Sequence, residues 1–148
     1  MITKRGLCFV LLCILLALTM TGCMVRLVGE YDDTTKEAIL KTAKEVDLFY
    51  ALLLETPENQ RPYEQFSKQY LSLETEIRSL VLRNKVRSLN KESTRIAEDI
   101  LALWIKYKEL HKTNNTYTTG NGKLDRKRLS NMFGYMLSAE LFKKDTGK

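Results

Sequence analysis

Cysteine is scarce in this 148-residue chain, and its three copies, Cys8, Cys13 and Cys23, all lie within the first 23 residues. The 125 residues after Cys23 have no thiol, which excludes a disulfide framework, a cysteine zinc site and a cysteine nucleophile from that part of the chain. The stability of this part must therefore come from packing. Its length is enough for one domain with a substantial core.

Histidine is scarcer still, because His111 is the single one. A di-iron four-helix bundle needs two Glu-x-x-His motifs, and Lys108 occupies the position three before His111, so this class of enzyme is excluded. Gly120 and Gly122 match neither a Walker motif nor a dinucleotide fingerprint. We interpret His111 as a polar residue near the end of a helix. The sequence thus predicts no catalytic residue, no metal site and no cofactor, and we do not expect an enzyme.

A strong excess of one charge is also missing. The chain has 24 lysines and arginines against 18 aspartates and glutamates, a formal net charge of +6, and the two signs are mixed along most of the sequence. Nucleic-acid-binding domains concentrate positive charge on one face or along one helix. We therefore expect no nucleic-acid partner.

The first 23 residues differ in composition from the rest of the chain. Lys4 and Arg5 form a short cationic head, and residues 7–20 are almost entirely apolar. This run is shorter than the roughly 20 residues that a transmembrane helix needs, and it has the length of the apolar part of an export signal. The pattern predicts a signal peptide that is removed from the mature protein.

The apolar run ends in Met20-Thr21-Gly22-Cys23, which resembles the lipobox of bacterial lipoproteins, with methionine where that family usually has leucine. The resemblance implies that Met20, Thr21 and Gly22 are recognised by the lipoprotein signal peptidase. It also implies that the thiol of Cys23 receives diacylglycerol and that Cys23 becomes the new amino terminus. Two alternatives remain open, an ordinary secretory peptide with a stray thiol and an uncleaved membrane anchor.

The same resemblance implies a location. Acyl chains on Cys23 would anchor the protein in a lipid bilayer of a bacterial cell envelope. Met24 rather than aspartate follows Cys23, as in lipoproteins that reach the outer membrane and face the periplasm of a Gram-negative cell. In a single-membrane bacterium the protein would stay on the outer face of the plasma membrane. The chain then divides into a signal peptide over residues 1–22, a lipidated tether over residues 23–33 and a helical domain over residues 34–148.

Helical periodicity fills the expected domain, because apolar residues recur at steps of three and four and no strand pattern competes. The predicted helices are residues 34–55, 62–87, 91–112 and 125–143. Asp33 or Thr34 can cap the first helix, with Glu37 completing a capping box. Residues 113–123 are predicted to be a loop. Short connections favour an all-α, antiparallel up-down four-helix bundle, and a three-helix core with a loosely docked fourth helix is the alternative.

In such a bundle, the turn between the second and third helices returns to the membrane end. This turn carries four cations, Arg83, Lys85, Arg87 and Lys91. Cations near an anionic lipid surface contribute about 1 kcal/mol each, so we expect these four to contact lipid headgroups. The last lysines of the chain would lie at the same end: Lys143, Lys144 and Lys148. The alternative is a solvated helix end with the cations that helix C-termini ordinarily carry.

The expected loop before the last helix offers a second candidate surface, at the end away from the membrane. Its residues are Tyr117, Lys123, Arg126, Lys127 and Arg128. Loops on rigid scaffolds often carry function, so this group is a candidate contact for a protein partner. A solvated connector followed by a charged first helical turn is the alternative.

We expect a membrane-anchored, non-catalytic structural or protein-interaction module with an envelope protein as partner. By architecture it is similar to pilotin lipoproteins, small helical adaptors that escort secretion-channel subunits, and exclusion or immunity lipoproteins are an equal possibility. A second hypothesis is a carrier or sensor of a small apolar ligand held among inward-facing aromatic residues. Those residues are Tyr50, Tyr63, Phe66, Tyr70, Trp104, Tyr107, Phe133 and Tyr135. A third hypothesis is an envelope enzyme of unrecognised mechanism.

Overall fold

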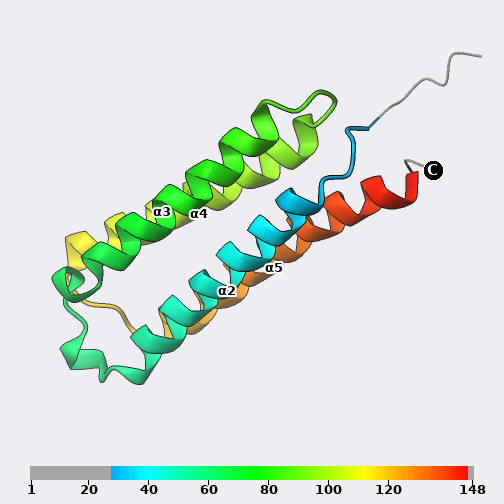
Figure 1. Cartoon of the computed structure of the whole chain (residues 1–148). Coiled ribbons are helices and arrows are strands. Elements are labelled where there is room, and N and C mark those ends of the chain that lie inside the picture. The colour runs from blue at the N-terminus through cyan, green and yellow to red at the C-terminus, as the bar shows by residue number, and fades with distance from the viewer. Residues whose placement is uncertain (1–27, 147–148) are drawn as a thin grey trace, which may run out of the picture.

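The computed structural model describes residues 28–146, which form four long helices and one short 3-10 turn, with no strand in this range. The elements are α2 (Asp33–Glu55), η1 (Glu58–Gln60), α3 (Tyr63–Lys85), α4 (Lys91–Asn114) and α5 (Thr119–Thr146). Figure 1 shows these helices packed lengthwise against one another. The predicted all-helical bundle is confirmed. The expected cleavage site and lipobox lie outside the described residues.

The helices pack as two close pairs, α2 with α5 and α3 with α4. The backbone N–H of Asp32, just before α2, donates to Glu140 near the end of α5, whereas Asp47 further along α2 pairs with Arg126 near the start of α5. The start of α2, the α3–α4 turn and the end of α5 therefore lie together at one end, here called the proximal end (Figure 1). The other two connections form the distal end.

The core is built from the apolar stripes of all four helices. The fully buried large side chains include Trp104, Tyr50, Tyr70, Ile77, Ile100 and Leu129. Trp104 donates its indole N–H to the carbonyl of Tyr70 at 3.2 Å, and its ring lies 5.2 Å from that of Phe49. The aromatic side chains that an apolar ligand would contact are largely packed on one another, and Tyr135 is exposed. Leu110 on α4 is also exposed.

The start of α2 differs from the predicted one. Asp32 caps the helix, with its carboxylate accepting from the backbone N–H of Thr34 at 3.1 Å and from the hydroxyl of Thr35 at 2.5 Å. The expected cap at Asp33 or Thr34 was therefore wrong. Glu37 forms an ion pair with Lys36 rather than completing a capping box. The structure also ends the second helix at Lys85 and not at residue 87.

The predicted loop over residues 113–123 was too long, because α4 continues to Asn114 and α5 begins at Thr119 rather than at residue 125, which leaves residues 115–118 as the connection. Asn115 ends α4 in the left-handed region, with φ of 49°. The hydroxyl of Thr118 accepts from the backbone N–H of Asn121 at 3.2 Å and so serves the first turn of α5. Gly122 lies against α2, since a Cβ there would be 2.9 Å from Leu54. Glycine therefore fits this position because α5 packs closely on α2, and not because the chain forms a loop there.

Gly134 offers a direct test of α5. It is exposed within the helix, and apart from its chain neighbours and the backbone of its own helix a Cβ there would meet no atom within 4 Å. Gly134→Ala should raise the free energy of unfolding by about 0.5–1 kcal/mol, because alanine loses less backbone entropy in a helix than glycine does. Urea unfolding followed by circular dichroism measures the change.

A contrasting variant is Gly29→Ala. Its Cβ would lie 2.9 Å from the backbone oxygen of Ser88, so this variant should be less stable than the native protein. If Gly134→Ala also lowers the stability, the described helix at this position is contradicted.

Candidate functional site

The proximal end brings together three segments that are distant in the sequence. Residues 28–32 run along the α3–α4 turn, and the N–H of Gly29 donates to the carbonyl of Leu89 at 2.9 Å. Gly29 is buried in this contact, with the backbone of Ser88 and Leu89 close to its Cα. The later part of the expected tether is thus packed on the domain, and residues 23–27 lie outside the described part of the chain.

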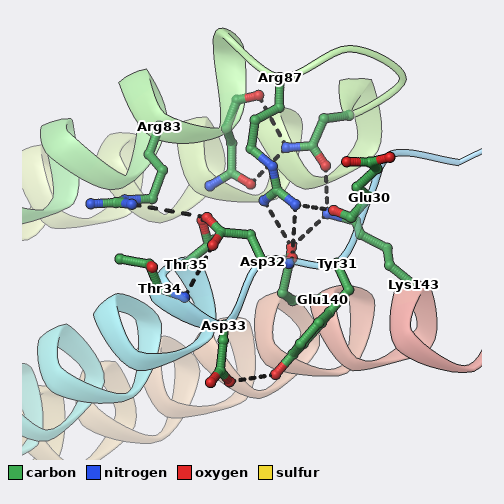
Figure 2. A network of polar contacts seen from close by, with 12 residues as sticks. Glu30, Tyr31, Asp32, Asp33, Thr34, Thr35, Arg83, Arg87, Glu140 and Lys143 are labelled. Carbon is green, nitrogen blue, oxygen red and sulfur yellow. Dashed lines mark hydrogen bonds and ion pairs between the residues drawn. The ribbon is translucent and has the colours of Figure 1, made fainter. Parts of the chain in front are cut away.

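A buried ion cluster, formed by Arg87, Glu140 and Lys143, links these segments (Figure 2). The two carboxylate oxygens of Glu140 accept from Arg87 at 2.8 and 3.1 Å, and Lys143 donates to one of them at 2.6 Å. The backbone N–H of Asp32 donates to the same carboxylate at 2.8 Å, and Arg87 also donates to the carbonyl of Glu30. The cluster therefore holds the entering chain, the α3–α4 turn and α5 together.

The electrostatics of the ion cluster favour a charged Glu140. Its side chain is 1% exposed, and burial alone would raise its pKa. The hydrogen bonds from Arg87 and Lys143 outweigh burial and hold the pKa of Glu140 below its usual value. Lys143 also donates to the side chain of Asn90, whose amide in turn donates to the carbonyl of Asn84 at 3.0 Å. These bonds fix the backbone of the turn.

Some of the cations that were expected to contact lipid are instead engaged within the fold. Arg87 was expected at the lipid surface, but its side chain is only 17% exposed and is engaged by Glu140, so that prediction was wrong. Arg83 is partly buried and lies 4.0 Å from Asp32. Lys85 and Lys91 are exposed as expected. Of the other lysines expected at this end, Lys143 belongs to the ion cluster, Lys144 lies 5.4 Å from the ring centre of Tyr31, and Lys148 is outside the described residues.

Apolar side chains accompany the two exposed lysines. One open hollow is lined by Lys85, Leu89 and Lys91 among others, and a neighbouring one by Val28, Leu89, Lys91 and Phe142. Val86 is 74% exposed and Leu89 is 57% exposed. We call the surface formed by Val28, Lys85, Val86, Leu89 and Lys91 the tip surface. The charge pattern of the turn pointed to its lysines, whereas Val86 and Leu89 were not singled out from the sequence.

The distal candidate surface is dispersed in the structure. Tyr117 was expected to be an exposed contact residue, but it is 5% exposed and its hydroxyl donates to Asp125 at 2.7 Å, so that prediction was wrong. Arg126 donates twice to the carboxylate of Asp47, at 2.6 and 2.7 Å. The remaining residues, Lys123, Lys127 and Arg128, are exposed on α5.

Arg61 is the main distal residue that sequence reasoning missed. It is 3% exposed and donates to the carbonyls of Leu54, Thr56 and Tyr117 at 2.7–3.1 Å, and to the hydroxyl of Thr119 at 3.2 Å. One guanidinium therefore joins the α2–α3 and α4–α5 connections. A single arginine in a turn gives no sequence signal for such a role.

His111 takes part in the same distal structure. Its Nε2 is 2.9 Å from the carbonyl oxygen of Arg61, and its Nδ1 is 3.1 Å from the hydroxyl of Tyr70. A carbonyl oxygen only accepts, so Nε2 carries the proton and Nδ1 accepts from Tyr70. Burial lowers the pKa of His111. Both ring nitrogens are thus held in structural hydrogen bonds, which agrees with its interpretation as a polar residue near the end of a helix.

This environment predicts a pH dependence. Because the folded pKa of His111 lies below its ordinary value of 6.5, the unfolded chain takes up a proton that the folded protein resists. The free energy of unfolding should therefore fall as the pH drops below about 6.5, down to the lower pKa of the folded state. Urea unfolding at a series of pH values measures this.

His111→Gln supplies the control, because the glutamine amide has a donor and an acceptor but no proton to gain in this range. In this variant the free energy of unfolding should no longer change with pH near pH 6. It should still fall below about pH 4.5, where carboxylates become protonated. An unchanged slope in the variant would contradict the assignment to His111.

Comparison with models of known protein families, with curated proteins and with solved structures found no match. Within residues 28–146, no three histidine, cysteine or acidic side chains are grouped so that they could hold a metal ion. No helix in this part of the chain has the length and apolarity needed to cross a bilayer. The strongest functional indications are therefore the lipobox-like motif over residues 20–23 and the proximal end, where the chain enters the helical domain.

Proposed function

We propose that this protein is a bacterial lipoprotein, held at a cell-envelope membrane by acyl chains on Cys23, whose helical bundle is a non-catalytic protein-interaction module. The observation that carries the proposal is the closeness of the lipobox-like motif to the domain. Four residues separate Cys23 from Val28, where the described chain begins and lies at the proximal end. An anchor on Cys23 would therefore hold that end within about 17 Å of the bilayer, at roughly 3.4 Å per residue.

Exposed apolar side chains support the interaction role. Leu48 is 54% exposed and Leu52 is 51% exposed, and residues four apart lie on the same face of a helix. Leu71 on α3 and Tyr135 on α5 are also more than half exposed. We propose these side chains as contact points for a protein partner, because a partner that covers them would remove apolar surface from water. In a Gram-negative cell we place the protein on the outer membrane, facing the periplasm.

Metabolic labelling tests the anchor. The native chain grown with a labelled fatty acid should incorporate the label and sediment with the membranes, because Cys23 is the proposed attachment point. Cys23→Ser should lose the label, and Cys13→Ser, a matched change inside the proposed signal peptide, should keep it. Equal labelling of Cys23→Ser and the native chain would overturn the proposal.

Photo-crosslinking in intact cells tests the interaction role. A photoreactive residue at Leu48, Leu71 or Tyr135 should give a discrete adduct with an envelope protein, and the adduct should be absent from cells that express the same chain with Cys23→Ser. If none of the three positions gives an adduct, the bundle is not an interaction module of this kind.

A further inference from the structure

We propose that the tip surface docks on an anionic lipid bilayer, with Lys85 and Lys91 binding headgroup phosphates and with Val86 and Leu89 inserted among the headgroups. The proposal rests on the proposed function for the anchor that brings the domain to a membrane. It adds a second, weaker contact that orients the bundle, with its proximal end on the bilayer and its distal end facing away.

The course of the chain places this surface next to any anchor that the amino-terminal sequence provides. Val28 is part of the tip surface and lines the same hollow as Leu89 and Phe142. Residue 23 is five positions away and the apolar run ends at residue 20, eight positions away. At about 3.4 Å per residue the tip surface therefore lies within roughly 27 Å of the bilayer, whether acyl chains or the apolar run forms the anchor.

The chemistry of the tip surface fits an interface between water and lipid. Val86 and Leu89 are 74% and 57% exposed, so more than half of each apolar side chain faces solvent. Lys85 and Lys91 line one hollow with Leu89, and Arg95 and Glu98 of opposite charge line the same hollow. Exposed apolar side chains beside lysines are the combination by which peripheral proteins bind anionic bilayers. The nearby Glu92 lies 3.8 Å from Arg95, which offsets its charge.

Leu89 is held outward by the backbone. Its φ is 55°, in the left-handed region that leucine rarely adopts, and its carbonyl accepts from the N–H of Gly29. The ion cluster fixes the same turn from inside, because Arg87 is bound to Glu140. The fold thus separates these three cations of the turn. Arg87 is directed inward, and Lys85 and Lys91 remain on the surface.

Fluorescence quenching tests the docking with the full chain as it is extracted from its membrane. A fluorophore is attached to Ser88→Cys, within the turn, or to Asn59→Cys, in η1 at the distal end; both positions are exposed. Each protein is reconstituted in phosphatidylcholine vesicles with or without phosphatidylglycerol, and with a nitroxide quencher at headgroup depth. The Ser88 reporter should be quenched more strongly than the Asn59 reporter, and more strongly when phosphatidylglycerol is present. Equal quenching at the two positions would overturn the proposal.

Charge variants separate docking from simple proximity. Lys85→Glu combined with Lys91→Glu should remove the phosphatidylglycerol dependence of the Ser88 reporter, with each lysine contributing about fivefold to the docked population. Lys68→Glu is the matched control, since Lys68 is an exposed lysine in the distal half of α3, and it should leave the quenching unchanged. Quenching that is unaffected by the double variant would overturn the role of the lysines.

Leu89→Asn tests insertion without disturbing the turn, because asparagine tolerates the left-handed backbone and the backbone bond to Gly29 is kept. We expect weaker quenching of the Ser88 reporter in both kinds of vesicle with unchanged circular dichroism. Native-like quenching in this variant would contradict insertion of Leu89.

The mass of the same preparations tells the two proposals apart. Acyl chains on Cys23 without preferential quenching at Ser88 would refute docking and leave the lipoprotein assignment standing. Preferential quenching in a chain without acyl groups would refute the lipoprotein and leave the docking surface standing.

Discussion

Replacing Glu140 by alanine should lower the free energy of unfolding by about 3–5 kcal/mol, because removal of one member of a buried ion cluster leaves uncompensated charge. Glu140 is 1% exposed, and both Arg87 and Lys143 would lose their carboxylate partner. The backbone N–H of Asp32 would lose its acceptor as well. Urea unfolding at neutral pH measures the effect.

Asp47→Ala is the matched control. Asp47 and Arg126 form a two-bond pair between the same two helices, α2 and α5, but their side chains are 53% and 38% exposed. Water screens such a pair, so its loss should change the stability by less than about 1 kcal/mol. If Glu140→Ala is no more destabilising than Asp47→Ala, the proximal end is not held by the ion cluster.

The charge state of Glu140 adds a pH signature. The pKa of Glu140 in the folded protein is lowered from 4.5. Its contribution to the free energy of unfolding is therefore present above that value and is lost as the pH falls through the folded pKa. Glu140→Gln should therefore reduce the acid sensitivity of the protein as well as its stability.

Arg61→Ala should destabilise the protein by about 3 kcal/mol or more, since hydrogen bonds of a charged donor are worth roughly 1.5–3 kcal/mol each and several buried acceptors would be left without one. Its guanidinium serves three carbonyls and one hydroxyl in both distal connections. Arg61→Lys should recover little of the loss, because a single ammonium cannot reproduce the planar fork that bridges the two connections.

Arg95→Ala provides the comparison for urea unfolding, because the Arg95 side chain is 73% exposed and its removal should change the stability by at most about 0.5 kcal/mol. Hydrogen exchange should also show faster opening of residues 115–118 and of the start of α3 in Arg61→Ala. Full rescue by Arg61→Lys would contradict the bridging role.

The helices could be predicted because burial imposes a period of three and four on the sequence. Ile39, Val46, Tyr50 and Leu53 follow this spacing in α2 and are all buried. The start of α5 could not be predicted in the same way. Gly122 suggested a loop, whereas its small size serves contact with Leu54, and such contact depends on a helix 68 residues earlier in the chain.

The candidate site shows the same division between local pattern and long-range contact. The basic turn was visible in the sequence, and Lys85 and Lys91 are exposed as expected. The partner of Arg87 is Glu140, which is 53 positions away, and no local pattern relates the two. Tyr117 was misjudged for a similar reason, because its polar surroundings in the sequence gave no sign that its ring packs in the core.

The intact mass of the membrane-extracted protein tests most directly whether Cys23 anchors the bundle. We expect the mass of a chain that begins at Cys23 and carries two or three acyl chains, and we expect this modification to be absent from Cys23→Ser. The unmodified mass of a chain that retains Cys8 and Cys13 would contradict an anchor on Cys23, and the amino-terminal segment would then be a different kind of membrane anchor.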